Sequence, residues 1–212
     1  LENIAPIGGR LFALYQKDAA SRLSVFNFDG EKLRDLALPA PGSASGVSGE
    51  PDGREGDFSF SSTFVPPTVF RYDMAADTLT VSDRVTTDIK TDRYEMKQVF
   101  YASKDGTQVP LFIVARKGLA LNGQNPCWLN GYGGFNVSTQ PAFQRNVFLW
   151  LEQGGVYAMA CIRGGGEYGE TWHEAGMRER KQNVFDDFIA AAEYLVANRY
   201  TSAARLAIQG GS

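Results

Sequence analysis

The feature that most constrains this fold is the alternation of short apolar runs with helical patterns after residue 92. Residues 126–130 and 156–162 are apolar runs, and the second is short and continuous enough to be a strand buried on both faces. A third run at residues 206–208 leads directly into Gly210-Gly211-Ser212. Strand, helix, strand, helix, strand in this order is typical of a parallel sheet with right-handed crossovers. The sequence therefore predicts an α/β domain in this part of the chain.

Two helices are predicted between these strands. Residues 141–153 carry apolar side chains at helical spacing and are followed by Gly154-Gly155, which suits a helix C-cap. Asn183 is expected to cap a second helix that ends near residue 198. Two aspartates would lie near its positive N-terminal end. The apolar stripe of this second helix is expected to comprise Val184, Phe185, Phe188, Ile189, Ala192, Leu195 and Val196.

A β-hairpin is predicted to open this domain. Residues 94–101 alternate roughly as a strand, Lys104-Asp105-Gly106 is a turn, and residues 109–115 form a second strand. The change in pattern places a domain boundary between residues 92 and 93. We therefore expect two domains, 1–92 and 93–212.

The first domain is predicted to be antiparallel β structure. Short aromatic and β-branched runs are separated by turns, and a unit of strand, connector, strand and acidic turn recurs at about 45 residues. That period is typical of β-propeller blades, with a plain β-sandwich as the alternative. The Gly/Ser/Pro-rich segment 39–53 is predicted to be a surface connection between the two units. Two blades cannot close a ring, so we expect the chain to be an excerpt from a longer polypeptide.

Composition excludes several classes of function. The 21 basic and 24 acidic residues give a net charge of −3, which is unfavourable for nucleic-acid binding through phosphates. No apolar run reaches the length of about 18 residues needed to span a bilayer, so no membrane partner is expected. Cys127 and Cys161 lie in apolar stretches and are interpreted as small buried hydrophobes. Neither they nor the N-terminal sequence separates a cytoplasmic from a periplasmic location.

Ser212 is the candidate nucleophile. A serine beside small residues directly after a strand suits a nucleophile elbow, although only the first half of the G-x-S-x-G pattern is present. Gly-Gly-Ser is also a common linker, but the preceding strand favours the elbow. A serine needs a His base and an acid to orient it. The single histidine, His173, precedes the serine in a polar loop, where hydrogen bonding or simple exposure is the expected role.

Four stretches then resemble the prolyl oligopeptidases, serine peptidases with an α/β-hydrolase domain and a β-propeller. They are Lys104-Asp105-Gly106-Thr107 with the strand after it, GYGGF at 131–135, RGGGEYGETWH at 163–173, and KQNVFDDF at 181–188 with the strand ending in GGS. Their order agrees with the family along residues 93–212. The resemblance implies the first part of an α/β-hydrolase domain, a parallel sheet with crossover helices, preceded by the last blades of a β-propeller.

The resemblance also implies roles for individual residues. Ser212 would be the nucleophile, Tyr132 would donate from its phenol to the oxyanion, and Phe135 would line the specificity pocket for a proline ring. From the residues alone, packing over the sheet edge is the preferred interpretation of Tyr132, whereas core packing explains Phe135 as well as a pocket role does. The triad Asp and His would lie in remaining segments of the same enzyme. Arg163 and Glu167 are expected to form an ion pair that fixes their loop, and the role of Asn130 stays open.

The implied function is a serine endopeptidase that cleaves short peptides after proline through an acyl-enzyme at Ser212, with no metal and no cofactor. The propeller would restrict access to short proline-containing peptides. Three alternatives remain open: a related oligopeptidase of other specificity, an esterase or lipase on the same fold, and a non-catalytic fragment or binding module with a degenerate hydrolase core.

Overall fold

A computed structural model describes residues 1–211 and divides the chain into two compact units. The first unit is Leu1–Asp88 together with the short segment Gln140–Phe143, and the second is Ile89–Thr139 with the chain from Gln144 onward. The units part after Asp88, whereas the domain boundary between residues 92 and 93 remains our prediction. Residues 140–143 were expected to begin a helix of the α/β domain, so their place in the first unit was not foreseen.

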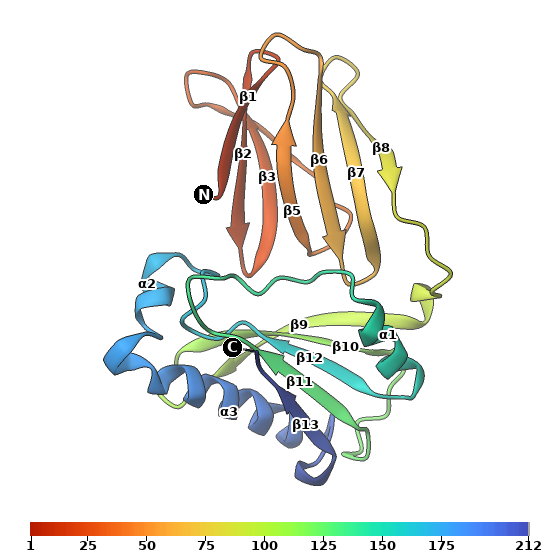
Figure 1. Ribbon diagram of the computed structural model, residues 1–212, viewed down its shortest axis with the longest axis vertical. Helices are drawn as coiled ribbons and strands as arrows, with labels where there is room; N and C mark the ends of the chain where they lie inside the picture. The colour runs from red at the N-terminus through yellow and green to blue at the C-terminus, as the bar shows by residue number, and fades with distance from the viewer. Residues whose placement is uncertain (212) are drawn as a thin grey trace. The chain divides into compact units, whose positions relative to one another are not determined.

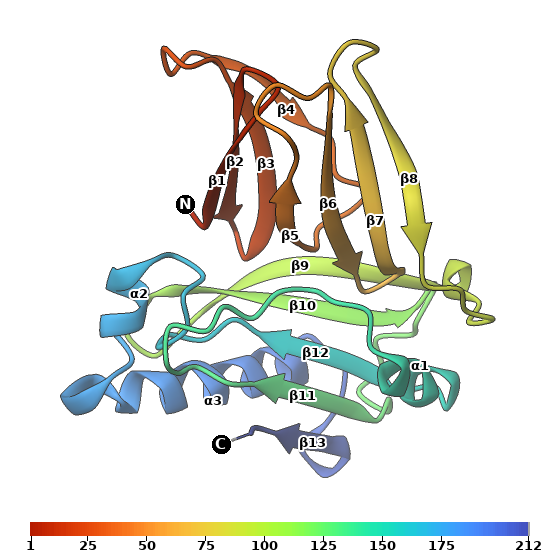
Figure 2. The same ribbon diagram turned by 45° about the horizontal axis from the view of Figure 1, so that its top comes forward.

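The first unit consists of two four-stranded antiparallel sheets (Figures 1 and 2). Each sheet is a meander in which sequential strands pair side by side. The strands of the first sheet are β1 (Asn3–Ile7), β2 (Arg10–Lys17), β3 (Ala20–Phe26) and β4 (Lys32–Leu36). Those of the second are β5 (Ser43–Ser48), β6 (Glu55–Ser62), β7 (Val65–Asp73) and β8 (Thr78–Arg84).

The repeat of about 45 residues corresponds to these two sheets. Leu11 and Phe58 lie on the second strands, and Val25 and Val69 lie on the third strands. Strand β6 alternates buried and more exposed positions along its whole length, as a strand with one core-facing side should. One apolar core includes residues from both sheets, namely Ile7, Phe12, Leu14, Leu23, Val25, Leu36, Ala44, Val47, Phe58, Phe60, Phe70 and Tyr72.

The expectation of a simple surface connection at residues 39–53 was wrong. This segment contains β5, which pairs antiparallel with β6 and buries Ala44 and Val47 in the core of the unit. Small residues such as Ser and Gly have low strand propensity, so the segment shows no strand signal in the sequence. Tertiary pairing with β6 supplies the order that the local sequence does not.

The second unit is built on a five-stranded sheet in the order β13-β11-β12-β10-β9. The strands β9 (Tyr94–Ala102) and β10 (Gln108–Arg116) form the predicted hairpin, and β10 also pairs antiparallel with β12 (Val156–Ala160). The strands β11 (Cys127–Gly131), β12 and β13 (Leu206–Gln209) run parallel. The predicted parallel order is thus confirmed, with the hairpin added at one edge. Every residue of β12 is buried, as expected for a strand covered on both faces.

Helices cover opposite faces of this sheet. Helix α3 (Gln182–Ala197) packs on the face that carries Leu129 and Ala158. On the other face Trp128 contacts Trp150 of α1 (Arg145–Glu152) and the ring of Tyr157. The shorter helical turns are η1 (Thr91–Arg93), α2 (Glu170–Glu174), η2 (Arg178–Arg180) and η3 (Ala203–Arg205).

Two details of the predicted helices were wrong. Helix α1 begins at Arg145 rather than near Pro141, because Phe143 donates its backbone N–H to Ser61 Oγ at 3.1 Å in the first unit. Asn183 does not cap α3, which follows the helical turn η2 and begins with Lys181 already in a helical conformation. The Asn183 amide instead donates to the carbonyl of Ala175 at 2.9 Å.

The apolar stripe of α3 was also only partly correct. Val184 and Leu195 are buried, but Phe185 and Ile189 are about half exposed, and the fully buried positions include Asp187. An aspartate in the buried face needs a partner, which the site described below supplies.

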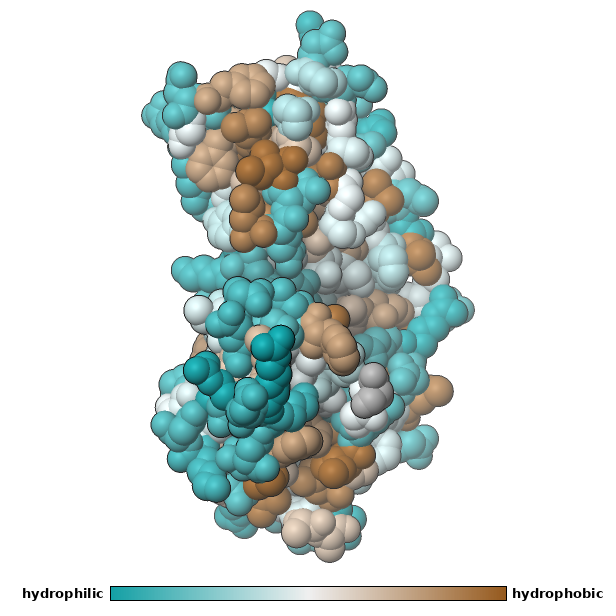
Figure 3. Space-filling view, turned by 60° about the vertical axis from the view of Figure 1, so that its left-hand side comes forward, coloured by the Kyte–Doolittle hydropathy of each residue, from teal (hydrophilic) through white to brown (hydrophobic). Residues whose placement is uncertain are grey.

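In Figure 3, one face of the molecule shows apolar patches among polar atoms at its lower end. No helix within residues 1–211 combines the length and the apolar character needed to cross a bilayer.

Candidate active site

The carboxyl ends of the three parallel strands meet at one edge of the sheet. In the strand register Asn130 lies opposite both Met159 of β12 and Gln209 of β13. A Cβ atom on Gly210 would lie 3.4 Å from the carbonyl oxygen of Gly131, so the chain after β13 passes beside the end of β11. Loops at this edge of an α/β sheet are the usual place for a ligand or an active site.

The glycine-rich turn after β11 is packed closely against the loop after β12. Gly133 has φ +62°, and a Cβ there would lie 2.6 Å from side-chain carbons of both Ile162 and Val184. Gly164 has φ +90°, and a Cβ there would lie 2.5 Å from the carbonyl oxygen of Gly133. Only glycine combines this backbone conformation with this close approach. The two glycine motifs of the sequence therefore fit against each other.

Tyr132 and Phe135 lie on this turn. Tyr132 is half-buried directly after β11, next to the strand end that Gly210 passes. Phe135 is 82% exposed, so the core-packing interpretation of this residue was wrong for the described part of the chain. Ser212, the candidate nucleophile, lies outside the described residues. The structure thus brings Tyr132, Phe135 and the chain leading to Ser212 to the same sheet edge, and the roles of these three residues remain predictions.

Arg163 is the centre of a charged cluster that the sequence did not reveal. Its guanidinium is 2.6 Å from Asp187 and 2.5 Å from Asp105, and its backbone N–H donates to Asp187 at 2.9 Å. Burial alone would lower the pKa of Arg163, but the hydrogen bonds to both carboxylates outweigh this and raise it. The same contact lowers the pKa of Asp105. The cluster ties the loop after β12 to the β9–β10 turn and to α3.

The expected ion pair between Arg163 and Glu167 was therefore wrong. Glu167 is buried, and its Oε1 accepts the backbone N–H of Thr139 at 2.7 Å. Within residues 1–211 its Oε2 has no hydrogen-bond partner, nor has the indole Nε1 of Trp172. Burial raises the pKa of Glu167 to about 7, although the hydrogen bond from Thr139 favours the ionised form. A signal that the sequence analysis missed was Asp187, the second of two adjacent aspartates, which falls among the apolar positions of α3 and is buried.

The remaining polar residues near the site have structural partners. The His173 Nδ1 atom lies 2.8 Å from the carbonyl oxygen of Gly164, which agrees with the hydrogen-bonding role expected for it. The Asn130 amide lies 3.4 Å from the Tyr157 hydroxyl. Both cysteines are free and fully buried, as expected.

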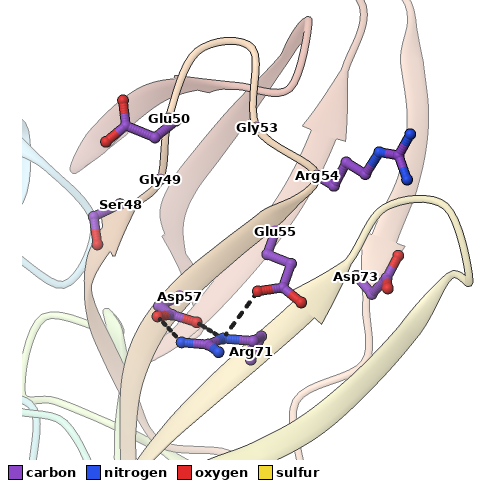
Figure 4. A pocket seen from close by; sticks show the side chains of 9 residues that line it. All are labelled: Ser48, Gly49, Glu50, Gly53, Arg54, Glu55, Asp57, Arg71 and Asp73. Atoms are coloured by element: carbon purple, nitrogen blue, oxygen red, sulfur yellow. Dashed lines mark hydrogen bonds and ion pairs between the residues drawn. The ribbon is translucent and has the colours of Figure 1, made fainter.

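A hollow of about 550 Å³ lies in the first unit and is lined by acidic and basic side chains (Figure 4). In this view Arg71 points toward Asp57 and Glu55, and its guanidinium is 2.9 Å from Asp57 and 3.5 Å from Glu55. These three charged side chains therefore pair with one another across the neighbouring strands β6 and β7. No group of three or more His, Cys, Asp or Glu side chains in the described chain is arranged to hold a metal ion.

Comparisons with known proteins agree with this architecture. The family model described as "Prolyl oligopeptidase, N-terminal beta-propeller domain" matches residues 1–85, and the model described as "Prolyl oligopeptidase family" matches residues 141–212. A prolyl endopeptidase of Elizabethkingia miricola is 44% identical over 205 residues, which are 97% of this chain and 29% of that protein. A prolyl endopeptidase of Dictyostelium discoideum is 41% identical over 207 residues, which are 96% of this chain and 27% of that protein.

Solved structures give the same result. A structure from a study of two prolyl endopeptidases superposes with a TM-score of 0.94 at 45% identity, covering 99% of this chain and 31% of that one. Prolyl oligopeptidase B from Galerina marginata, bound to a 35mer hydrolysis and macrocyclization substrate, superposes with a TM-score of 0.93 at 34% identity. That match covers 100% of this chain and 31% of the other. The chain thus spans less than a third of the length of the relatives it matches.

The fold and the matched models define the first part of an α/β-hydrolase domain preceded by β-propeller blades, as predicted. The chain belongs to the prolyl oligopeptidase family. The propeller sheets are partial and do not close. The family assignment also decides between the propeller and the plain sandwich in favour of the propeller.

Proposed function

We propose that this chain is part of a serine endopeptidase that cleaves short peptides on the carboxyl side of proline. The single observation that carries the proposal is the convergence of the Tyr132 turn with the chain leading to Ser212, at the carboxyl edge of the sheet. The matched relatives are named prolyl endopeptidases and prolyl oligopeptidases, which supports the same activity for the protein that contains this chain.

The proposed reaction is acyl transfer to serine followed by hydrolysis. Ser212 Oγ attacks the carbonyl carbon of the proline residue and its proton passes to a histidine base, which gives that proton to the amine as the amine leaves and the carbonyl reforms. The same histidine then takes a proton from the water that attacks the acyl-enzyme, and returns it to Ser212 Oγ as the acid leaves. Tyr132 donates a hydrogen bond from its phenol to the oxyanion that forms in each step. Phe135 offers an exposed aromatic face to the proline ring.

His173 does not suit the role of base. It precedes Ser212 in the chain, whereas hydrolases of this fold carry their histidine after the serine. Its Nδ1 is already held by Gly164. The proposal therefore assigns the triad Asp and His to remaining segments of the same enzyme, and it requires neither metal nor cofactor.

The test is a pair of substitutions in the full-length protein, assayed on peptides that differ only in Pro, Ala or Arg before the scissile bond. Ser212→Ala should lower kcat on the prolyl peptide by at least about 10³-fold, because the acyl-enzyme cannot form. Tyr132→Phe should lower kcat by about 10²-fold with little change in KM, because the phenol acts in the transition state.

The outcomes separate the alternatives. Wild-type cleavage after proline that survives Ser212→Ala would refute the nucleophile assignment. Preference for Arg or Ala before the scissile bond would indicate a related oligopeptidase of other specificity. Hydrolysis of an ester substrate together with no hydrolysis of any of the peptides would indicate an esterase. Peptide binding without any turnover would support a non-catalytic module.

A further inference from the structure

The turn that carries Phe135 has an unusual backbone. The N–H of Val137 donates to the carbonyl of Gly134 at 3.0 Å, and both residues between them have positive φ, +53° at Phe135 and +58° at Asn136. Two successive positive φ values define a type I′ arrangement, which favours Asn and Gly. Asn136 suits its position, but a bulky aromatic residue with positive φ is uncommon and strained. Such strain persists only where surrounding contacts hold it, and it is concentrated at functional sites.

Contacts from the loop after β12 hold this turn on one side. The carbonyl oxygen of Gly164 lies 3.1 Å from the backbone nitrogen of Asn136 and accepts its N–H. The backbone at Gly166 also approaches closely, because a Cβ there would lie 2.7 Å from the carbonyl oxygen of Asn136 and 2.9 Å from Ser138 Oγ. The turn is therefore fixed by its neighbours and not by its own sequence.

His173 completes these contacts. Its Nδ1 atom lies 2.8 Å from the carbonyl oxygen of Gly164 and 3.1 Å from the backbone nitrogen of Asn136. At 2.8 Å one atom of the first pair must supply a proton, and a carbonyl has none, so Nδ1 carries the hydrogen and donates. With that hydrogen in place Nδ1 cannot accept from Asn136. The Gly164 carbonyl thus receives two donors, one from the turn and one from His173.

We propose that His173 is a positioning residue which, through the carbonyl of Gly164, holds the strained turn that presents Phe135 to the residue before the scissile bond. This inference rests on the proposed function and deepens it by adding a residue that determines specificity. His173 itself touches no substrate in this role. His173 lies on the short helix α2, and its Nδ1 atom is within 3.1 Å of both Gly164 and Asn136.

The test uses two replacements of His173 in the full-length protein. His173→Asn places an amide nitrogen at the same number of bonds from Cα as Nδ1 and keeps the donor, whereas His173→Phe keeps a ring and removes it. Each is combined with Phe135→Ala, and Glu174→Gln, on the exposed side of the same helix, is the matched control. The measured quantities are kcat and KM on a prolyl peptide anilide and on its alanyl analogue.

The phenylalanine variant should raise KM on the prolyl substrate about five- to tenfold and reduce the preference for Pro over Ala. The asparagine variant should stay within about twofold of the wild type. Because His173 acts through Phe135, the double variant His173→Phe/Phe135→Ala should have the same Pro-to-Ala preference as Phe135→Ala alone. A purely structural role would instead lower the thermal midpoint and leave this preference unchanged, which would overturn the inference.

Amide hydrogen exchange distinguishes failure of the inference from failure of the proposed function. A peptide covering residues 132–139 should exchange faster in His173→Phe than in the wild type or in His173→Asn, whatever the substrate. A wild-type protein with no preference for proline would refute the proposed function and the specificity role with it. Unchanged exchange and unchanged preference in a proline-cleaving protein would refute the positioning role alone.

Discussion

Burial of Glu167 predicts an unusual dependence of stability on pH. The pKa of this carboxyl rises from 4.5 to about 7 because burial disfavours its charge. A carboxyl whose pKa is raised by folding binds its proton more tightly in the folded state, so it destabilises the folded state when it ionises. Wild-type stability should therefore fall as the pH rises from 4.5 to 7 and then level off, relative to a variant that cannot ionise. At about 1.4 kcal/mol per pKa unit, the total loss is about 3 kcal/mol.

The variant is Glu167→Gln, whose amide oxygen can still accept the N–H of Thr139. Thermal unfolding of the full-length proteins is followed by calorimetry from pH 4.5 to 8.5, with the exposed Glu174→Gln as the matched control. The difference in thermal midpoint between Glu167→Gln and the wild type should grow with pH by roughly 2 °C in favour of the variant. Glu174→Gln should show no such slope. A difference that stays constant across this range would refute the neutral state of Glu167.

Three further predictions concern the same unit. Asp187→Asn should lower the free energy of unfolding by about 3–5 kcal/mol, because it leaves the buried Arg163 guanidinium with one carboxylate partner fewer. Asp105→Asn should lower it by less than about 1 kcal/mol, because Asp105 is half exposed. Denaturant unfolding of both variants measures the two losses, and equal losses would contradict the prediction. Gly133→Ala should destabilise the protein far more than Gly154→Ala, because a Cβ at 133 collides with its neighbours whereas one at 154 meets only open space. At 154 the positive φ alone should cost about 1–2 kcal/mol of backbone strain. The thermal midpoints of the two variants provide the comparison. Neither cysteine should react with a thiol reagent until the protein unfolds, because burial raises the pKa of both thiols, and labelling followed by mass spectrometry would reveal any native reaction.

The strand content was predictable where a strand carries its own apolar or alternating pattern. The runs that became β11 and β12 are apolar throughout, and the repeat in the first unit follows from aromatic and β-branched residues at matching positions. Strand β5 lacked any such pattern, since Ser and Gly make up most of it. Its strand conformation comes from pairing with β6, so it depends on a tertiary contact that the local sequence does not reveal.

The candidate site was predictable only as a place in the fold. The glycine-rich motifs that contain Gly133 and Gly164 predict two tight turns, and the parallel strands β11 and β12 bring these turns to the same edge of the sheet. The left-handed backbone of Phe135 could not be inferred, because its own side chain disfavours that conformation. The conformation depends on contacts with residues about 30 positions later in the chain.

The error over Arg163 shows how such contacts fix the site. A guanidinium four residues from Glu167 suggested a local pair, yet its carboxylate partners are Asp105 and Asp187, which are 58 and 24 residues away. Asp187 receives both the side chain and the backbone N–H of Arg163, so the loop after β12 is anchored to α3 at its first residue. The next residue of that loop, Gly164, is the one that holds the Phe135 turn. It follows that substitutions of Asp187, which lies outside the sheet edge, should disturb the Phe135 turn more than substitutions of the exposed side chain of Val137, which takes part in the turn only through its backbone N–H.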